Sequence, residues 1–129
     1  MSVQAYQKVA TRTKGPRESE YQIFARVTRA LIEAFAGDPL AIGVRAKATG
    51  ENRQLWSALA IDCANPDNRL PQDTRAAIIS LSIFVDKYTS QVMREGADPE
   101  VLIDINRTIM QGLAPSASED AATARQAAL

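Results

Sequence analysis

Prolines divide this chain at the intervals expected between helices. Most of them stand in short turn signals, which are Gly15-Pro16, Gly37-Asp38-Pro39, Leu70-Pro71 and Gly96-Ala97-Asp98-Pro99. Proline is tolerated in the first turn of a helix, where its missing N–H would have no intrahelical partner. Gly37 and Gly96 suit a left-handed residue at the end of the preceding helix, and Asp38 and Asp98 suit the N-cap of the next. The positions of proline and glycine predict an all-α fold, without a sheet, with helices near 16–36, 39–64, 71–95 and 99–113.

Apolar residues recur every three or four positions inside these segments, as expected for helices with one buried face. In the segment 39–64 this stripe contains Asn52, Leu55, Trp56, Leu59 and Cys63. Gly50 is its weak point, because glycine in a helix interior costs about 1 kcal/mol relative to alanine. The segment therefore forms either one helix or two short ones.

The third segment is apolar almost all around. Ile79, Leu81, Ile83 and Val85 alternate as they would in a strand, but the stretch from Gln72 to Glu95 lacks Gly and Pro and is too long for a typical strand. In a helix, one line remains consistently polar, namely Arg75, Ser82, Asp86 and Thr89. A helix of this kind either lies at the centre of a bundle or shares a face with a partner.

The two ends of the chain differ from the middle. Residues 2–13 suit a short helix or arm, whereas residues 114–129 are rich in Ala and polar residues and offer no stripe of large apolar side chains. We therefore expect a single bundle of four to five helices in a domain spanning 1–113, followed by a disordered tail over 114–129.

Charge and composition exclude several classes of function. The 129 residues include fifteen basic and fifteen acidic ones and no histidine. Zero net charge argues against a dedicated nucleic-acid-binding protein, which usually carries a basic excess. The absence of histidine removes the commonest general base and metal ligand. We expect no catalytic, metal or cofactor site, and neither a signal peptide nor a membrane span, which predicts a cytoplasmic protein that is not an enzyme.

A few residues admit two interpretations. Cys63 has no histidine to activate it and is interpreted as a small buried apolar residue. Trp56 is either a core anchor or, with Arg53 one turn away, an interface anchor. Asn52 and Asn106 lie on or beside apolar stripes, where each satisfies backbone groups or sets the register against a partner.

Several short blocks of sequence occur in an order and spacing that are similar to one family. They are Met1-Ser2-Val3 with Ala5-Tyr6, Pro16-Arg17 with Glu20-Tyr21, Asn52-Arg53-Gln54-Leu55-Trp56-Ser57, Asp62-Cys63, Ile78-Ile79-Ser80-Leu81-Ser82 and Asn106-Arg107-Thr108-Ile109-Met110-Gln111-Gly112-Leu113. Together they resemble the flagellar biosynthesis regulator FlaF family from Met1 to about Leu113. The resemblance implies a small cytoplasmic protein that controls flagellin synthesis and export, opposite a second regulator, FlbT, which restrains flagellin translation.

This resemblance and the wide apolar helix faces suggest a chaperone-like protein that binds unassembled flagellin. Flagellin's terminal segments are amphipathic and poorly ordered until assembly, and a bundle with an open groove would cover such a segment. The residues expected at this surface, or directly supporting it, are Asn52, Arg53, Leu55, Trp56, Leu59, Phe84, Tyr88, Ile105, Asn106, Ile109 and Met110. The alternatives are an RNA-binding regulator of flagellin messenger RNA and a structural helical homodimer. The neutral charge and the few aromatic residues count against RNA binding.

Truncation after Leu113 is expected to leave the melting temperature nearly unchanged, because residues 114–129 offer almost no large apolar side chains to bury. Thermal unfolding of the full chain and the truncated chain, followed by circular dichroism, checks this. A loss of many degrees would mean that the tail packs on the helical domain.

Overall fold

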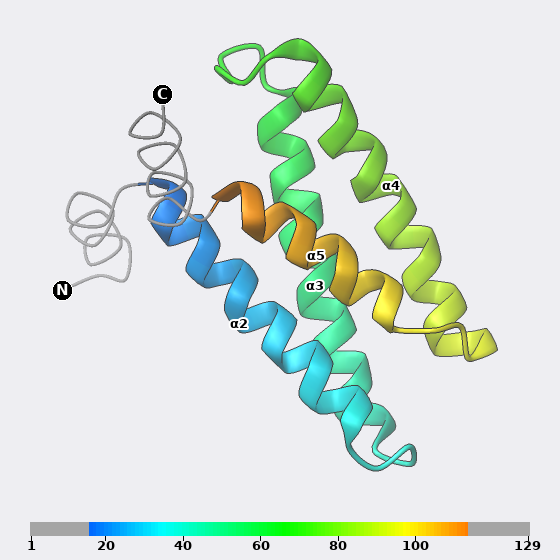
Figure 1. The fold of residues 1–129 in the computed structure, drawn as a ribbon. Helices are drawn as coiled ribbons and strands as arrows, with labels where there is room; N and C mark the ends of the chain where they lie inside the picture. Colours follow the sequence, from blue (N-terminus) through cyan, green and yellow to red (C-terminus); the bar gives the residue numbers. More distant parts are fainter. Residues whose placement is uncertain (1–15, 114–129) are drawn as a thin grey trace, which may run out of the picture. The chain divides into compact units, whose positions relative to one another are not determined.

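The computed structural model describes residues 16–113, and this part of the chain is helical, without strands. The helices are α2 (Pro16–Ala36), α3 (Ile42–Ala64), α4 (Gln72–Glu95) and α5 (Glu100–Leu113) (Figure 1). The predicted all-α fold is confirmed, including a helix through Ile79 and Val85, where the sequence alternates like a strand. The predicted N-terminal helix and the predicted disordered tail both lie outside the described residues, and the domain boundary at residue 113 stays a prediction.

The segment around Gly50 forms one uninterrupted helix. α3 runs from Ile42 to Ala64 without a break at Gly50, which settles the choice between one helix and two. It begins three residues later than predicted, because Asp38 accepts a hydrogen bond from the Leu40 backbone N–H at 2.9 Å and holds residues 38–40 in a turn. Asp38 therefore caps the turn and not the helix. Asp98 does act at a helix start, where it accepts the Glu100 backbone N–H at 2.9 Å.

The described chain divides into two compact units, and each is described by itself. One contains residues 16–26 and 105–113, and in it Phe24 and Asn106 are buried. The other, Val27–Asp104, contains the second half of α2, all of α3 and α4, and the start of α5. Its core draws on each of these helices, and its largest buried side chains are Leu31, Trp56, Val85 and Leu102.

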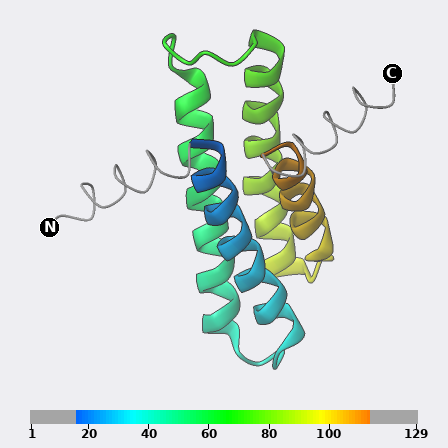
Figure 2. The same ribbon diagram turned by 60° about the vertical axis from the view of Figure 1, so that its left-hand side comes forward.

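α3 and α4 form an antiparallel helical hairpin within the second unit, and the two helices lie side by side along their length (Figure 2). Two threonines are buried in this hairpin, and each hydroxyl donates to a carbonyl of its own helix. Thr49 Oγ1 bonds to the Arg45 carbonyl at 2.8 Å, and Thr89 Oγ1 bonds to the Val85 carbonyl at 2.6 Å. The internal bonds allow these polar residues to occupy core positions without an unsatisfied hydroxyl.

The ends of α2 and α4 are closed in different ways. Gly96 is left-handed, with φ of 70°, and its N–H and that of Ala97 both donate to the Gln91 carbonyl, as predicted for a glycine after a helix. The same prediction for Gly37 is wrong, since Gly96 is the one described residue with positive φ. The Arg45 guanidinium closes α2 instead, donating through Nε to the Ala34 carbonyl at 3.3 Å. The same group lies 4.7 Å from the centre of the Phe35 ring, in a cation–π contact.

Substitution of Gly96 by alanine is expected to lower the free energy of unfolding by about 1 kcal/mol, because a Cβ disfavours the left-handed conformation. Gly43→Ala is the matched control, since Gly43 lies in the first turn of α3 and an added Cβ there meets nothing within 4 Å. Chemical denaturation of both variants measures the difference. Equal stability of the two variants would contradict the role assigned to the left-handed cap.

Candidate partner-binding site

The seam between α3 and α4 is lined by polar groups of α4. Arg75 Nε donates to the Cys63 carbonyl at 2.8 Å, and Ser82 Oγ donates to the Trp56 carbonyl at 3.1 Å. Arg75 and Ser82 belong to the polar line of α4, together with Asp86 and Thr89, and Thr89 is fully buried. Arg75, Ser82 and Thr89 of this line therefore face the rest of the unit, whereas the Asp86 side chain is exposed to solvent.

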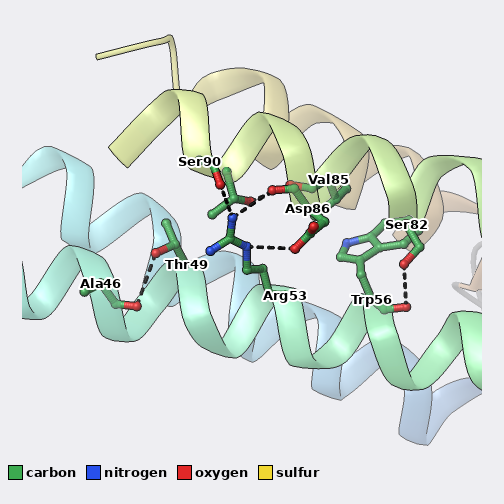
Figure 3. A network of polar contacts seen from close by, with 9 residues as sticks. Ala46, Thr49, Arg53, Trp56, Ser82, Val85, Asp86 and Ser90 are labelled. Carbon is green, nitrogen blue, oxygen red and sulfur yellow. Dashed lines mark hydrogen bonds and ion pairs between the residues drawn. The ribbon is translucent and has the colours of Figure 1, made fainter. Parts of the chain in front are cut away.

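Arg53 is the centre of this seam (Figure 3). Its Nη2 donates to the Asp86 backbone carbonyl at 2.8 Å and to Ser90 Oγ at 2.5 Å, and its Nε lies 3.2 Å from Asp86 Oδ1. An ion pair this exposed contributes little by itself, on the order of 0–1 kcal/mol. The bonds to a carbonyl and a hydroxyl of α4 add geometric specificity and fix the register of the two helices. Arg53 is thus engaged within the chain, and its main role is to join α3 to α4.

The three most deeply buried of the predicted site residues are core residues. Trp56 is 1% exposed, and Asn52 and Asn106 are fully buried. Cys63 is also buried, as predicted for a small apolar residue. Trp56 is therefore a core residue and not an exposed anchor.

The predicted residues on α4 form an aromatic pair at the surface. Phe84 is 43% exposed, and its ring stacks on that of Tyr88 with centroids 5.4 Å apart. The Tyr88 hydroxyl donates to the Asp98 carbonyl at 2.9 Å, which ties α4 to the turn before α5. Phe84 is therefore available to a partner, while Tyr88 has a structural bond.

The other predicted residues are half-buried. Leu55 and Leu59 lie on α3 in the second unit, whereas Ile105, Ile109 and Met110 lie on the part of α5 that belongs to the first unit. Half-buried apolar side chains suit the margin of a core as well as the margin of an interface. The prediction that they contact a partner stays a prediction.

Sequence analysis missed the most exposed apolar residues. Leu40, Ile42 and Val44 project from the turn between α2 and α3 and the first turn of α3, and Ile61 and Ile83 project from α3 and α4. Ile61 falls outside the stripe of Asn52, Trp56 and Cys63, and this departure from the period was the available signal. Ile83 carried no such signal, because nearly every side of α4 is apolar.

Residues 16–113 contain neither a membrane-spanning helix nor a metal-binding cluster. None of the described helices combines the length and apolarity needed to cross a bilayer. The same residues contain no cluster of Cys, Asp and Glu side chains suited to hold a metal ion.

The described residues define a small all-α protein. Polar contacts join its helices α3 and α4, and apolar side chains stay exposed at its surface. A family model described as flagellar protein FlaF matches residues 2–113, which is most of the chain. The chain belongs to the FlaF family and is a flagellar protein. Neither a curated protein nor a solved structure matches it.

Trp56→Ala and Phe84→Ala are expected to differ sharply in stability. Removal of the buried indole should cost about 3–5 kcal/mol of unfolding free energy, because the cavity does not refill. Phe84 is 43% exposed and its removal should cost under about 1.5 kcal/mol, mainly the stacking with Tyr88. Urea denaturation of the two variants measures both values. A small effect of Trp56→Ala would contradict its placement in the core.

Proposed function

We propose that this FlaF-family protein binds unassembled flagellin as a chaperone-like partner in the cytoplasm, and thereby modulates flagellin synthesis and export. The observation that carries the proposal is the set of large apolar side chains left at the surface of the described residues. They are Ile23, Ile32, Leu40, Ile42, Val44, Ile61, Leu70, Ile83 and Phe84. Among them, Leu40, Ile42 and Val44 are close in the sequence, and an exposed apolar patch commonly marks an interaction site.

Flagellin fits such a surface because its terminal segments are amphipathic and poorly ordered before assembly. An amphipathic segment buries its apolar side when it folds as a helix against an apolar surface. Ordering the segment consumes about 2–5 kcal/mol of the interaction free energy, which keeps the complex reversible. A reversible complex protects the monomer from aggregation and still releases it for export.

The RNA-binding alternative has less support from the described residues. Recognition of single-stranded RNA combines basic grooves with aromatic side chains on which bases stack. Trp56 is buried, and Tyr88 is bonded within the chain, so few aromatic faces are available in the described part. If the protein binds flagellin, a functional link to FlbT arises because both proteins act on flagellin. The remaining alternative is a homodimer that buries the same apolar side chains.

Purified flagellin titrated into this protein is expected to give a saturable heat, with an affinity that falls only modestly between low and moderate salt. Apolar contacts are weakly screened, whereas phosphate contacts lose affinity steeply as salt rises. Calorimetry at two salt concentrations, with flagellin messenger RNA titrated in parallel, measures both. Absence of flagellin binding together with steeply salt-dependent RNA binding would replace the chaperone hypothesis with the RNA regulator.

A further inference from the structure

One surface of the α3–α4 hairpin combines exposed apolar and basic side chains, and we call it the outer face. Its residues on α3 recur every three or four positions, and so do those on α4. They are Gly43, Lys47, Gly50, Gln54, Ser57 and Ile61 on α3, and Ile79, Ile83, Lys87, Ser90 and Arg94 on α4. All of them are exposed or half-buried, and the face includes the Arg53–Asp86 ion pair drawn in Figure 3.

Apolar side chains occupy one half of the outer face. Ile61 is 73% exposed and Ile83 is 54% exposed. The bonds from Arg75 to Cys63 and from Ser82 to Trp56 set the antiparallel register of the helices. In this register, Ile61 lies within about one helical turn of Ile79 on α4, and Ile83 is one turn further along. The isoleucines thus form one apolar strip across the seam.

Basic side chains occupy the other half. Lys47, Lys87 and Arg94 are exposed, and none forms an ion pair with a residue in the range 16–113. The remaining arginine on this side, Arg53, is matched by Asp86. The outer face is therefore net positive although the chain has no net charge. Its electrostatic complement is an acidic partner.

The outer face has no side chain at Gly50, which the same register places in the basic half, between the levels of Lys87 and Arg94. A Cβ added at Gly50 would meet nothing within 4 Å, so no packing contact within the protein requires glycine there. Glycine at this mid-helix position nevertheless costs about 1 kcal/mol relative to alanine. The absence of a side chain at Gly50 would allow the backbone of a partner to come close to α3.

We propose that the outer face docks an amphipathic helix of unassembled flagellin that crosses α3 at Gly50. The helix sets its apolar side on Ile61 and Ile83 and its acidic flank on Lys47, Lys87 and Arg94. The inference rests on the proposed function and names the surface and the chemistry that perform it. A protein helix suits this face better than RNA does, because its apolar half offers aliphatic side chains and no aromatic ring for base stacking.

The role of the missing side chain at Gly50 is tested with Gly50→Gln, which places a long polar side chain on the outer face without adding charge. Gly112→Gln is the matched control, because an added Cβ at Gly112 of α5 also meets nothing within 4 Å. Both variants should keep or raise the melting temperature, since Gln forms helix better than Gly. Gly50→Gln should weaken flagellin binding at least about tenfold, which corresponds to about 1.4 kcal/mol, while Gly112→Gln leaves it unchanged.

The charge is tested with the double substitution Lys87→Glu and Arg94→Glu. It should weaken flagellin binding by about tenfold at low salt and by less at moderate salt, because added salt screens the interaction between exposed charges. Arg29→Glu is the control, since Arg29 is an exposed arginine of α2 outside the outer face. Calorimetric titration with purified flagellin, at two salt concentrations, measures every variant.

The outcomes separate this inference from the proposed function. If the unmodified protein binds flagellin and both sets of outer-face variants bind it equally well, the surface assignment is overturned and flagellin binding stands. If the unmodified protein does not bind flagellin, both fail. If Gly50→Gln instead dissociates a homodimer and leaves flagellin binding intact, the face belongs to a second copy of this chain and the inference is overturned.

Discussion

The side-chain hydrogen bonds between α3 and α4 are the constraint on which the rest of the second unit depends. Arg75, Ser82 and Arg53 each join a side chain of one helix to a backbone oxygen of the other. Each such bond contributes only about 0.5–1.5 kcal/mol net, but its loss would leave a polar group without a partner at a packed seam. The seam thus fixes the rotation of α4 about its own axis. With this rotation, Val85 and Val92 are in the core, and Ile83 and Phe84 are at the surface.

This rotation of α4 leaves apolar side chains exposed, where a partner can bind them. A helix that is apolar almost all around cannot bury every side in a unit of this size, and the polar line of α4 decides which side is left out. If Arg75, Ser82 and Thr89 faced solvent, the isoleucines would pack against α3 and little apolar surface would remain for a partner. The polar seam therefore stabilises the hairpin and also leaves Ile83 exposed.

The sequence predicted the helices well because proline and glycine act locally. The effect of a proline in a first turn, or of a left-handed Gly96, does not depend on the rest of the fold. Trp56 and Cys63 could also be placed, since both lie on the regular apolar stripe of α3. The closing of α2 by Arg45 was not predictable, because its guanidinium reaches back across the turn to the carbonyls of Ala34 and Gly37. The inward direction of Arg75, Ser82 and Thr89 on α4 was equally hidden, since polar side chains aligned on a helix usually face water.

Gly50 shows why part of the proposed site could not be predicted from the sequence. In a monomer, a glycine is retained inside a helix when its φ, or a close neighbour within the fold, requires it. Neither applies to Gly50, which lies in a regular helix with open space beside it. Sequence analysis could identify it only as a weak point, because its surroundings are visible only in three dimensions. Once α4 is in place, the same residue lies on a surface with the basic side chains Lys47, Lys87 and Arg94. Gly50 weakens the isolated helix and lowers the surface at that point, and both effects follow from its missing side chain.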